Sequence, residues 1–174
     1  MKKRVIVTGG AGYIGSHTAV ELAQAGYTPV LIDNFSNSKP QVLDALAGIL
    51  GFQPELEQVD CANRDELFQA VQRIAASGTV SGVIHFAAFK AVGESTEQPL
   101  KYYSNNITST VNLLEAMKSN GLEHFVFSSS CTVYGQPEAS PVDEEERIRT
   151  AESPYGYTKQ VCERLIRDVC ASGY

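Results

Sequence analysis

The feature that most constrains the fold is a glycine-rich segment near the N-terminus, VTGGAGYIGSH, at residues 7–17. Its first two residues end a largely β-branched run, Arg4 to Thr8, that is too short for a helix. It leads into residues 13–25, whose apolar side chains recur at helical spacing. Glycines between a strand and a helix let the backbone approach a pyrophosphate, which the free N–H groups at the helix start then bind. The segment therefore predicts a dinucleotide-binding loop, and the alternative is a tight turn without a ligand.

An acidic residue supports this prediction and suggests which dinucleotide is bound. Gly9, Gly12 and Gly15 match G-x-x-G-x-x-G, and Asp33 follows at the end of the next apolar run, residues 28–32. An acid at this position accepts hydrogen bonds from the adenosine ribose hydroxyls. Because its charge repels a 2′-phosphate, we expect NAD rather than NADP. The alternative is that Asp33 is a turn residue.

The rest of the chain alternates between strand and helix signals, which predicts a Rossmann-like α/β fold: a doubly wound parallel sheet with helices on both faces. Further strands are expected at 28–32, 56–59, 82–87 and 124–129, and further helices at 39–50, 64–76, 99–119 and 154–171. The polar and acidic segment 136–152 breaks this alternation and is predicted to be a surface loop. A length of 174 residues suits one domain, residues 1–174.

Composition argues against two classes of partner. The formal net charge is -6, so the chain is a poor general binder of nucleic acid or of an anionic membrane. No apolar run approaches the ~20 residues needed to cross a bilayer. The basic N-terminal tip runs straight into the first strand, without the apolar stretch of a signal peptide. These features predict a cytoplasmic protein.

Cysteines and histidines indicate neither disulfides nor a metal. The four cysteines include no C-x-x-C pair and are expected to be free thiols; they are Cys61, Cys131, Cys162 and Cys170. The three histidines lie far apart in sequence, without metal-ligand spacing; they are His17, His85 and His124. We therefore expect no metal site.

A tyrosine and a lysine one helical turn apart are the candidate catalytic groups. In SPYGYTK, residues 153–159, Ser153 is a natural N-cap and Pro154 a natural first helical residue. Tyr155 and Lys159 then share one helix face. A free tyrosine is a poor base at neutral pH, but a nearby ammonium group favours its phenolate. The pair could act as general base and acid on an alcohol, or could be an ordinary surface pair.

A hydroxyl group is expected to complete this site. The segment SSSCTVYG, residues 128–135, follows the predicted strand 124–129. Either Ser130 or Ser129 could hydrogen-bond the reacting oxygen.

Together these motifs resemble the extended short-chain dehydrogenase/reductase family, and most closely its sugar-nucleotide 4-epimerases. The resemblance spans the whole chain and rests on TGGAGYIGSH, DN-x-x-NS, HFA-x-x-KAVGES, YY-x-NN, FSSS-x-TVYG and SPYG-x-x-K. It implies that Tyr155 is the acid and base, that Lys159 binds the cofactor ribose and tunes the tyrosine, and that Ser130 holds the 4-oxygen of the sugar.

The resemblance also implies which residues contact the ligands. Those expected to contact NAD are Gly9, Gly12, Tyr13, Ile14, Gly15, Asp33, Asn34, Phe35, Ser36, Asn37, Ser38, Asp60, Cys61, Phe86, Ala87, Ala88, Lys90, Asn105, Ser128, Tyr155 and Lys159. Those expected to contact the UDP-sugar are Lys90, Ser130, Cys131, Thr132 and Tyr155.

The implied reaction interconverts UDP-glucose and UDP-galactose by transient oxidation at C4 and return of the hydride to either face, as in galactose metabolism. The resemblance further implies a homodimer formed through the helices at 99–119 and 154–171. Two alternatives are an NAD-binding module with little activity and a sugar-nucleotide 4,6-dehydratase. Dehydratases carry an acidic residue after the serine-rich strand, where this chain has Cys131 and Thr132.

Three departures from the family pattern stand out. Cys61 replaces a branched apolar residue beside the adenine, and Tyr157 replaces a common lysine. The chain also ends at Tyr174, whereas family members continue into a C-terminal substrate domain. If these residues were the whole protein, the strand at 124–129 would expose an unpaired edge and promote association.

Overall fold

The computed structural model describes residues 3–138 and 140–174. The tip at residues 1–2 and position 139 of the predicted loop lie outside the described residues. The chain divides into two compact units, Met1–Ala87 with Ser109–Ser128, and Ala88–Thr108 with Ser129–Tyr174. A single domain over residues 1–174 stays a prediction.

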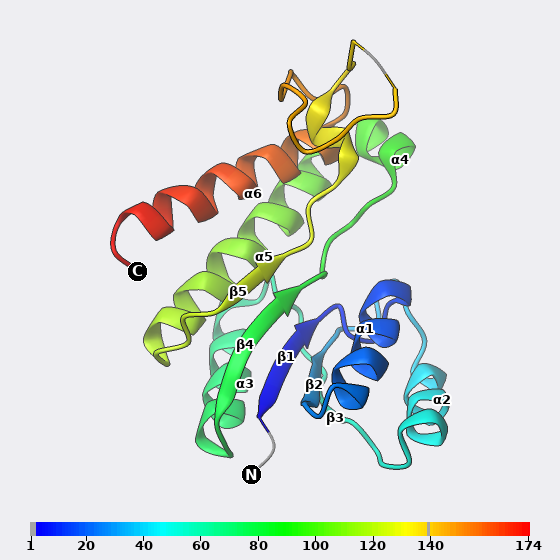
Figure 1. The fold of residues 1–174 in the computed structure, drawn as a ribbon, viewed down its shortest axis with the longest axis vertical. Helices are drawn as coiled ribbons and strands as arrows, with labels where there is room; N and C mark the ends of the chain where they lie inside the picture. The colour runs from blue at the N-terminus through cyan, green and yellow to red at the C-terminus, as the bar shows by residue number, and fades with distance from the viewer. Residues whose placement is uncertain (1–2, 139) are drawn as a thin grey trace. The chain divides into compact units, whose positions relative to one another are not determined.

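The first unit contains a five-stranded parallel sheet in the order β3-β2-β1-β4-β5, which confirms the predicted fold class (Figure 1). The strands are β1 (Arg4–Thr8), β2 (Thr28–Ile32), β3 (Glu55–Glu57), β4 (Val80–His85) and β5 (Phe125–Phe127). The third and fifth strands are shorter than predicted, and β4 begins two residues earlier. Among the described residues β5 pairs with β4 alone, as expected for an edge strand.

Helices cover both faces of this sheet because its central strands are apolar on both sides. On one face Val7 and Leu31 pack with residues of α1 (Tyr13–Gln24) and α2 (Gln41–Leu50). Since side chains alternate along a strand, Ile6 points to the opposite face, and it too is fully buried. Figure 1 places α3 (Arg64–Ala76) behind the sheet on that side. The helix buries an apolar stripe of Leu67, Ala70, Val71 and Ile74.

The carboxyl ends of the strands bring distant residues to one edge of the sheet. Gly9 follows β1, Asp33 follows β2, Asp60 follows β3 and Phe86 follows β4. From β1 the chain adds β2 and β3 on one side of the sheet and then β4 and β5 on the other side. The point at which the strand order reverses therefore lies between β1 and β4. Ligands of doubly wound folds bind in the crevice at such a point.

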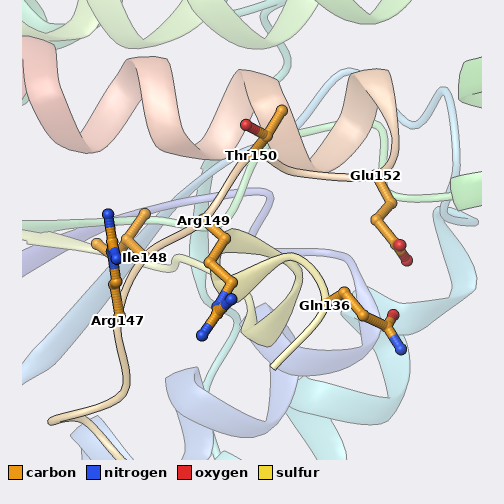
Figure 2. A pocket seen from close by; sticks show the side chains of 6 residues that line it. All are labelled: Gln136, Arg147, Ile148, Arg149, Thr150 and Glu152. Carbon is orange, nitrogen blue, oxygen red and sulfur yellow. The ribbon is translucent and has the colours of Figure 1, made fainter. Parts of the chain in front are cut away.

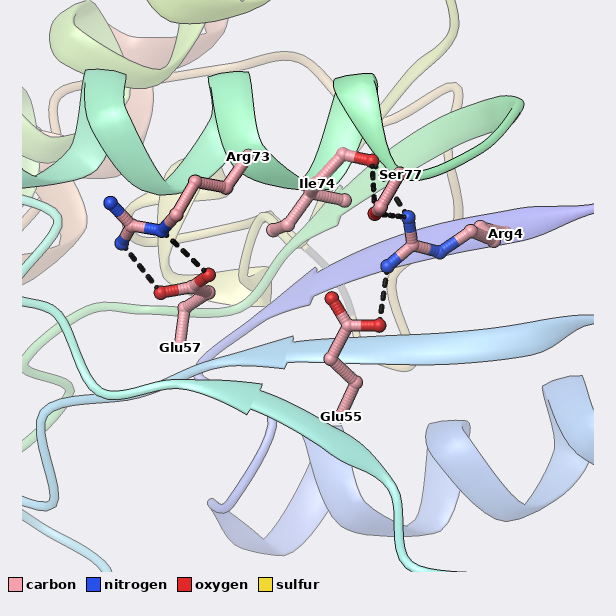
Figure 3. A network of polar contacts seen from close by, with 6 residues as sticks. All are labelled: Arg4, Glu55, Glu57, Arg73, Ile74 and Ser77. Carbon is pink, nitrogen blue, oxygen red and sulfur yellow. Dashed lines mark hydrogen bonds and ion pairs between the residues drawn. The ribbon is translucent and has the colours of Figure 1, made fainter.

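At the amino-terminal ends of the strands, a polar network around Arg4, a buried residue of β1, connects β1 with β3 and α3 (Figure 3). Its guanidinium donates to the Ile74 carbonyl at 2.7 Å, to the Ser77 hydroxyl and to the Glu55 carboxylate. Nearby, Arg73 and Glu57 form a bidentate pair at 3.1 and 2.7 Å. These contacts fasten α3 and β3 at the end of the sheet away from the glycine loop.

The second unit contains mainly helices: α4 (Val92–Glu97), the first half of α5 (Pro99–Ser119), the 3-10 helix η1 (Cys131–Tyr134) and α6 (Pro154–Ala171). Helix α6 starts as predicted, because the Ser153 hydroxyl accepts a hydrogen bond from the Gly156 amide at 3.1 Å. Neither α4 nor η1 was predicted, since each is too short to show a helical period.

The predicted surface loop contains neither helix nor strand at residues 136–138 and 140–152. Over the part of the chain that the structure describes, no helix combines the length and apolar character that crossing a membrane requires.

Candidate functional site

The glycine loop is packed too closely for side chains. Gly9 has φ of +67°, a left-handed conformation that favours glycine, and a Cβ there would lie 2.8 Å from the Ala87 amide nitrogen. A Cβ on Gly15 would lie 2.2 Å from the Gly9 carbonyl oxygen. The first turn of α1 therefore lies directly against the loop, and the end of β4 closes its other side.

The start of α1 has the features of an anion-binding helix end. Its N-cap is Gly12, which has no side chain to cap the first amides of the helix. The next two side chains are large, yet Tyr13 is 77% and Ile14 50% exposed. Free amides beside exposed apolar groups fit a ligand with both a pyrophosphate and a flat ring system.

Asp33 is held against this loop. One carboxylate oxygen accepts from the Ala11 amide at 3.0 Å, and the other accepts from the Phe35 amide at 2.8 Å and the Ser38 hydroxyl at 2.9 Å. The oxygen bound to Ala11 keeps a lone pair for a further donor, because a carboxylate oxygen can accept two hydrogen bonds. Asp33 thus has a fixed orientation and can still bind a ribose hydroxyl.

The segment after Asp33 is shaped by local turns. Phe35 has φ of 58°, an uncommon conformation for a non-glycine residue, which the hydrogen bond to Asp33 supports. The Asn34 side chain accepts from the Ser36 amide at 2.9 Å. Asn37 and Ser36 are exposed beside it.

Cys61 is structural in character. Burial raises the pKa of its thiol to about 12, and the charges of Asp60 and Asp33 add to this effect. The thiol is thus neutral and unreactive at neutral pH. Asp60 caps the local turn by accepting from the Ala62 amide at 2.8 Å, and Asn112 of α5 donates to the Cys61 carbonyl at 3.1 Å. An apolar thiol therefore takes the place of the expected branched residue.

In the second unit, the proposed catalytic pair is almost entirely buried. Tyr155 is 9% and Lys159 4% exposed, one turn apart on α6. Burial lowers the pKa of Lys159 from 10.5 to about 8, although Cys162 and Glu163 partly oppose this shift. The lysine is still cationic at neutral pH, but it gives up its proton in mildly alkaline solution.

The serine-rich segment lies against the first turn of α6. A Cβ on Gly156 would be 3.1 Å from the Thr132 carbonyl oxygen. Ser130 caps η1, its oxygen accepting from the Thr132 amide at 3.3 Å and the Thr132 hydroxyl at 3.0 Å. Ser129 instead donates to Glu163. Since Ser130 accepts in both of its contacts, its own proton can be donated to a ligand, which favours Ser130 over Ser129.

Two further groups near this pair were not predicted as site residues. Asn106, the second asparagine of YY-x-NN, accepts from the Phe89 amide at 2.9 Å and donates to the Phe89 carbonyl at 3.0 Å. It also donates to Thr158 of α6 at 3.1 Å. Asn106 therefore fixes the segment that carries Lys90. The motif YY-x-NN includes Asn106, but from the sequence we expected only Asn105 to contact NAD.

The second group is a buried tyrosine beside Tyr155. The Tyr102 hydroxyl donates to Glu94 at 2.6 Å, and Lys101 pairs with the same carboxylate at 2.7 Å. Burial and the Glu94 carboxylate raise the pKa of Tyr102 to about 12. Its ring meets that of Tyr155 edge to face, with centroids 6.5 Å apart. Sequence periodicity could not find this arrangement, because Glu94 lies on the short helix α4.

The predicted site residues are divided between the units. Ala88, Lys90, Asn105, Ser130, Cys131, Thr132, Tyr155 and Lys159 belong to the second unit, and the other predicted ligand contacts belong to the first. Within the described residues, no group of three or more His, Cys, Asp or Glu could hold a metal ion.

An open cavity of about 650 Å³ lies elsewhere in the second unit (Figure 2). Its lining consists of Gln136, Arg147, Ile148, Arg149, Thr150 and Glu152, and includes none of the predicted site residues. Arg149 also pairs with Glu138. The cavity is therefore distinct from the candidate site.

Known proteins similar to this chain include sugar-nucleotide epimerases. Over 169 residues the chain is 48% identical to UDP-glucose 4-epimerase of Dictyostelium discoideum, covering 97% of this chain and 48% of that protein. Its identity to the human UDP-glucose 4-epimerase is 47% over 176 residues, covering 98% of this chain and 49% of the other. The chain thus spans about half the length of the curated relatives it matches.

Solved structures give the same result. The fold matches UDP-glucose-4-epimerase from Stenotrophomonas maltophila, solved with NAD and formylated UDP-arabinopyranose, with a TM-score of 0.91 and 43% identity over 99% of this chain and 50% of that one. It matches the Bifidobacterium longum enzyme, solved with NAD+ and UDP, with a TM-score of 0.91 and 39% identity, covering 98% and 50%. A family model, "NAD dependent epimerase/dehydratase family", matches residues 5–174. With its glycine loop, acidic strand end and tyrosine–lysine helix, this chain belongs to that family.

Proposed function

We propose that this chain carries the NAD-binding and proton-transfer residues of an enzyme that interconverts UDP-glucose and UDP-galactose. The observation that carries the proposal is the almost complete burial of Tyr155 and Lys159 on one face of α6. Burying a lysine costs free energy, and ionisable groups perturbed in this way are frequent at functional sites. The family resemblance indicates which function Lys159 would serve.

The residues of the first unit fit NAD. The loop from Gly9 to Gly15 would hold the pyrophosphate with backbone amides, and Asp33 would accept a ribose hydroxyl. The exposed side chains of Tyr13 and Ile14 support a neighbouring ring system. Bound NAD would supply the hydride chemistry at C4 of the sugar, first as the hydride acceptor and then, once reduced, as the donor.

The residues of the second unit would move the proton. Tyr155 removes the proton of the sugar 4-hydroxyl during oxidation and gives it back on reduction. The Lys159 ammonium stabilises the phenolate form and would bind the nicotinamide ribose. Ser130 donates a hydrogen bond that keeps the 4-oxygen in place.

We also propose a cytoplasmic homodimer. Two exposed apolar side chains on these helices, Leu100 on α5 at 82% and Tyr157 on α6 at 45%, support a contact with a second copy. All four cysteines are thiols rather than disulfides, as expected in a reducing compartment.

The test is to mix the purified chain with UDP-galactose and a trace of NAD, and to quantify UDP-glucose. Product in large excess over NAD would establish the epimerase. Bound NAD without product would instead indicate a binding module, and a dehydrated 4-keto sugar would indicate a dehydratase. A chain that binds no NAD would contradict the role of the glycine loop.

A further inference from the structure

The segment that carries Ser130 is held at two points by helix α6. Ser129, just before it, donates its hydroxyl proton to the Glu163 carboxylate. Val133, three residues after it, accepts a hydrogen bond from the Gln160 side-chain amide at 2.7 Å. Gln160 and Glu163 are three residues apart, so they lie on one face of the helix. Ser130 therefore lies between two anchors on the helix that also carries Tyr155.

Gln160 makes a second contact that strengthens its anchor. The same amide nitrogen donates to the Arg149 carbonyl, in the loop that leads into α6. Both of its protons are thus used, and one side chain joins η1, the loop and the helix. A primary amide has the two N–H protons that binding two carbonyls in this way requires. Leucine would have a similar size and would donate nothing.

Close backbone packing explains why the distance between η1 and α6 matters. A Cβ on Gly135 would lie 2.4 Å from the Thr150 carbonyl oxygen, and a Cβ on Gly156 would lie 3.1 Å from the Thr132 carbonyl oxygen, a looser but still tight contact. The backbone segments are therefore in direct contact on both sides of the Gln160 anchor. A small shift of η1 along the helix would change where the Ser130 hydroxyl points relative to Tyr155.

We infer that Gln160 and Glu163 act as positioning residues, a two-point clamp that keeps the Ser130 hydroxyl in register with Tyr155. The inference rests on the proposed function, because the 4-oxygen of the sugar must meet both groups at once. Misplacing a positioned group lowers turnover much more than it lowers substrate binding. The clamp itself can be measured without turnover.

Hydrogen exchange tests the clamp directly. The amides of Thr132, Val133 and Gly135 are bonded within the Ser130 turn, so their exchange reports its opening. We expect Gln160→Leu and Ser129→Ala each to speed this exchange about three- to tenfold, the effect of losing one or two modest hydrogen bonds. The double variant should be faster than either. Unchanged exchange in both single variants would overturn the inference.

Controls separate the clamp from general stability. Gln72→Leu makes the same change on α3 at an exposed residue and should leave these amides unaffected. Ser129→Thr keeps the hydroxyl that Ser129→Ala removes, so the exchange of these amides should be as slow as in the wild type. If Gln160→Leu unfolds, Ser129→Ala decides the question, because Ser129 is exposed and its loss removes no core packing.

Kinetics then test the link to catalysis. In holoenzyme that turns over UDP-galactose, Gln160→Leu should lower kcat about tenfold or more while KM changes little. Equal kcat values for this variant and the wild type would contradict a positioning role. If the wild type itself has no activity, the proposed function fails, and the exchange data still decide whether the clamp exists.

Discussion

At the scale of single residues, Lys159 shows a conflict between stability and function. The structure buries an ammonium group and thereby lowers its pKa to about 8. A group whose pKa is lower in the folded state than in the unfolded state destabilises the fold at low pH. The cost of the charged lysine is present in full below pH 8 and disappears as pH rises towards the ordinary value of 10.5.

Replacing this lysine should stabilise the protein. We expect Lys159→Met to raise the free energy of unfolding at pH 7 by about 1–3 kcal/mol, because a flexible apolar side chain replaces a desolvated charge. The gain should shrink between pH 8 and 10, where the wild-type lysine also becomes neutral. Urea denaturation of both proteins across this range measures the effect. A gain that is absent, or that does not depend on pH, would refute this explanation.

Tyr155 and Tyr157 form a matched pair for testing proton transfer. Tyr155→Phe removes one hydroxyl from a buried ring and should reduce epimerase turnover by about 10²-fold or more. NAD binding should change little. Tyr157→Phe removes the same group two residues away, where the ring is 45% exposed, and should leave kcat near that of the wild type. Similar kcat values for the two variants would contradict the assignment.

At the scale of elements, the contact between the glycine loop and α1 can be tested with a single methyl group. Gly15→Ala places a Cβ 2.2 Å from the Gly9 carbonyl oxygen, so the helix must move away from the loop. We expect NAD affinity to fall by about tenfold or more, as measured by calorimetry. Unchanged affinity would show that the close packing does not shape the cofactor site.

The matched control lies in the last turn of α2. A Cβ on Gly48 would meet nothing within 4 Å. Gly48→Ala should therefore leave NAD affinity unchanged and raise stability by up to about 1 kcal/mol, because alanine favours the helix.

The Arg4 network connects three elements at the far end of the sheet. Arg4→Met removes the guanidinium that donates to Ile74, Ser77 and Glu55, although Ser77 still donates to the Ile74 carbonyl. The loss of these hydrogen bonds should lower the free energy of unfolding by about 1–3 kcal/mol in urea denaturation. Arg73→Met, at an exposed pair beside it, should have a smaller effect. Equal effects of the two variants would mean that burial of Arg4 contributes nothing.

At the scale of the whole molecule, the sequence predicted the elements with a strong period and missed the short ones. Three helices match their predicted bounds, 64–76, 99–119 and 154–171, because each has several turns of regular apolar spacing. Helix α4 and η1 were missed since one or two turns show no period. Strands were found by their β-branched runs, but their ends depend on the neighbouring strands, which a sequence does not display.

The candidate site shows the same limit. Residues in linear motifs, such as Gly15, Asp33 and Tyr155, could be predicted because their spacing carries the chemistry. The contacts of Glu94 with Tyr102, and of Gln160 with Val133, join residues through space. Their burial and direction depend on packing, so sequence spacing gave no sign of them.

The central claim is that the sugar is oxidised at C4 and then reduced by the same hydride. It is tested most directly with UDP-galactose carrying deuterium at C4, incubated with the chain and NAD in ordinary water. We predict UDP-glucose that retains deuterium at C4, detected by mass spectrometry of the isolated product. Product that has exchanged this deuterium for solvent hydrogen, or no product from a chain that binds NAD, would contradict it.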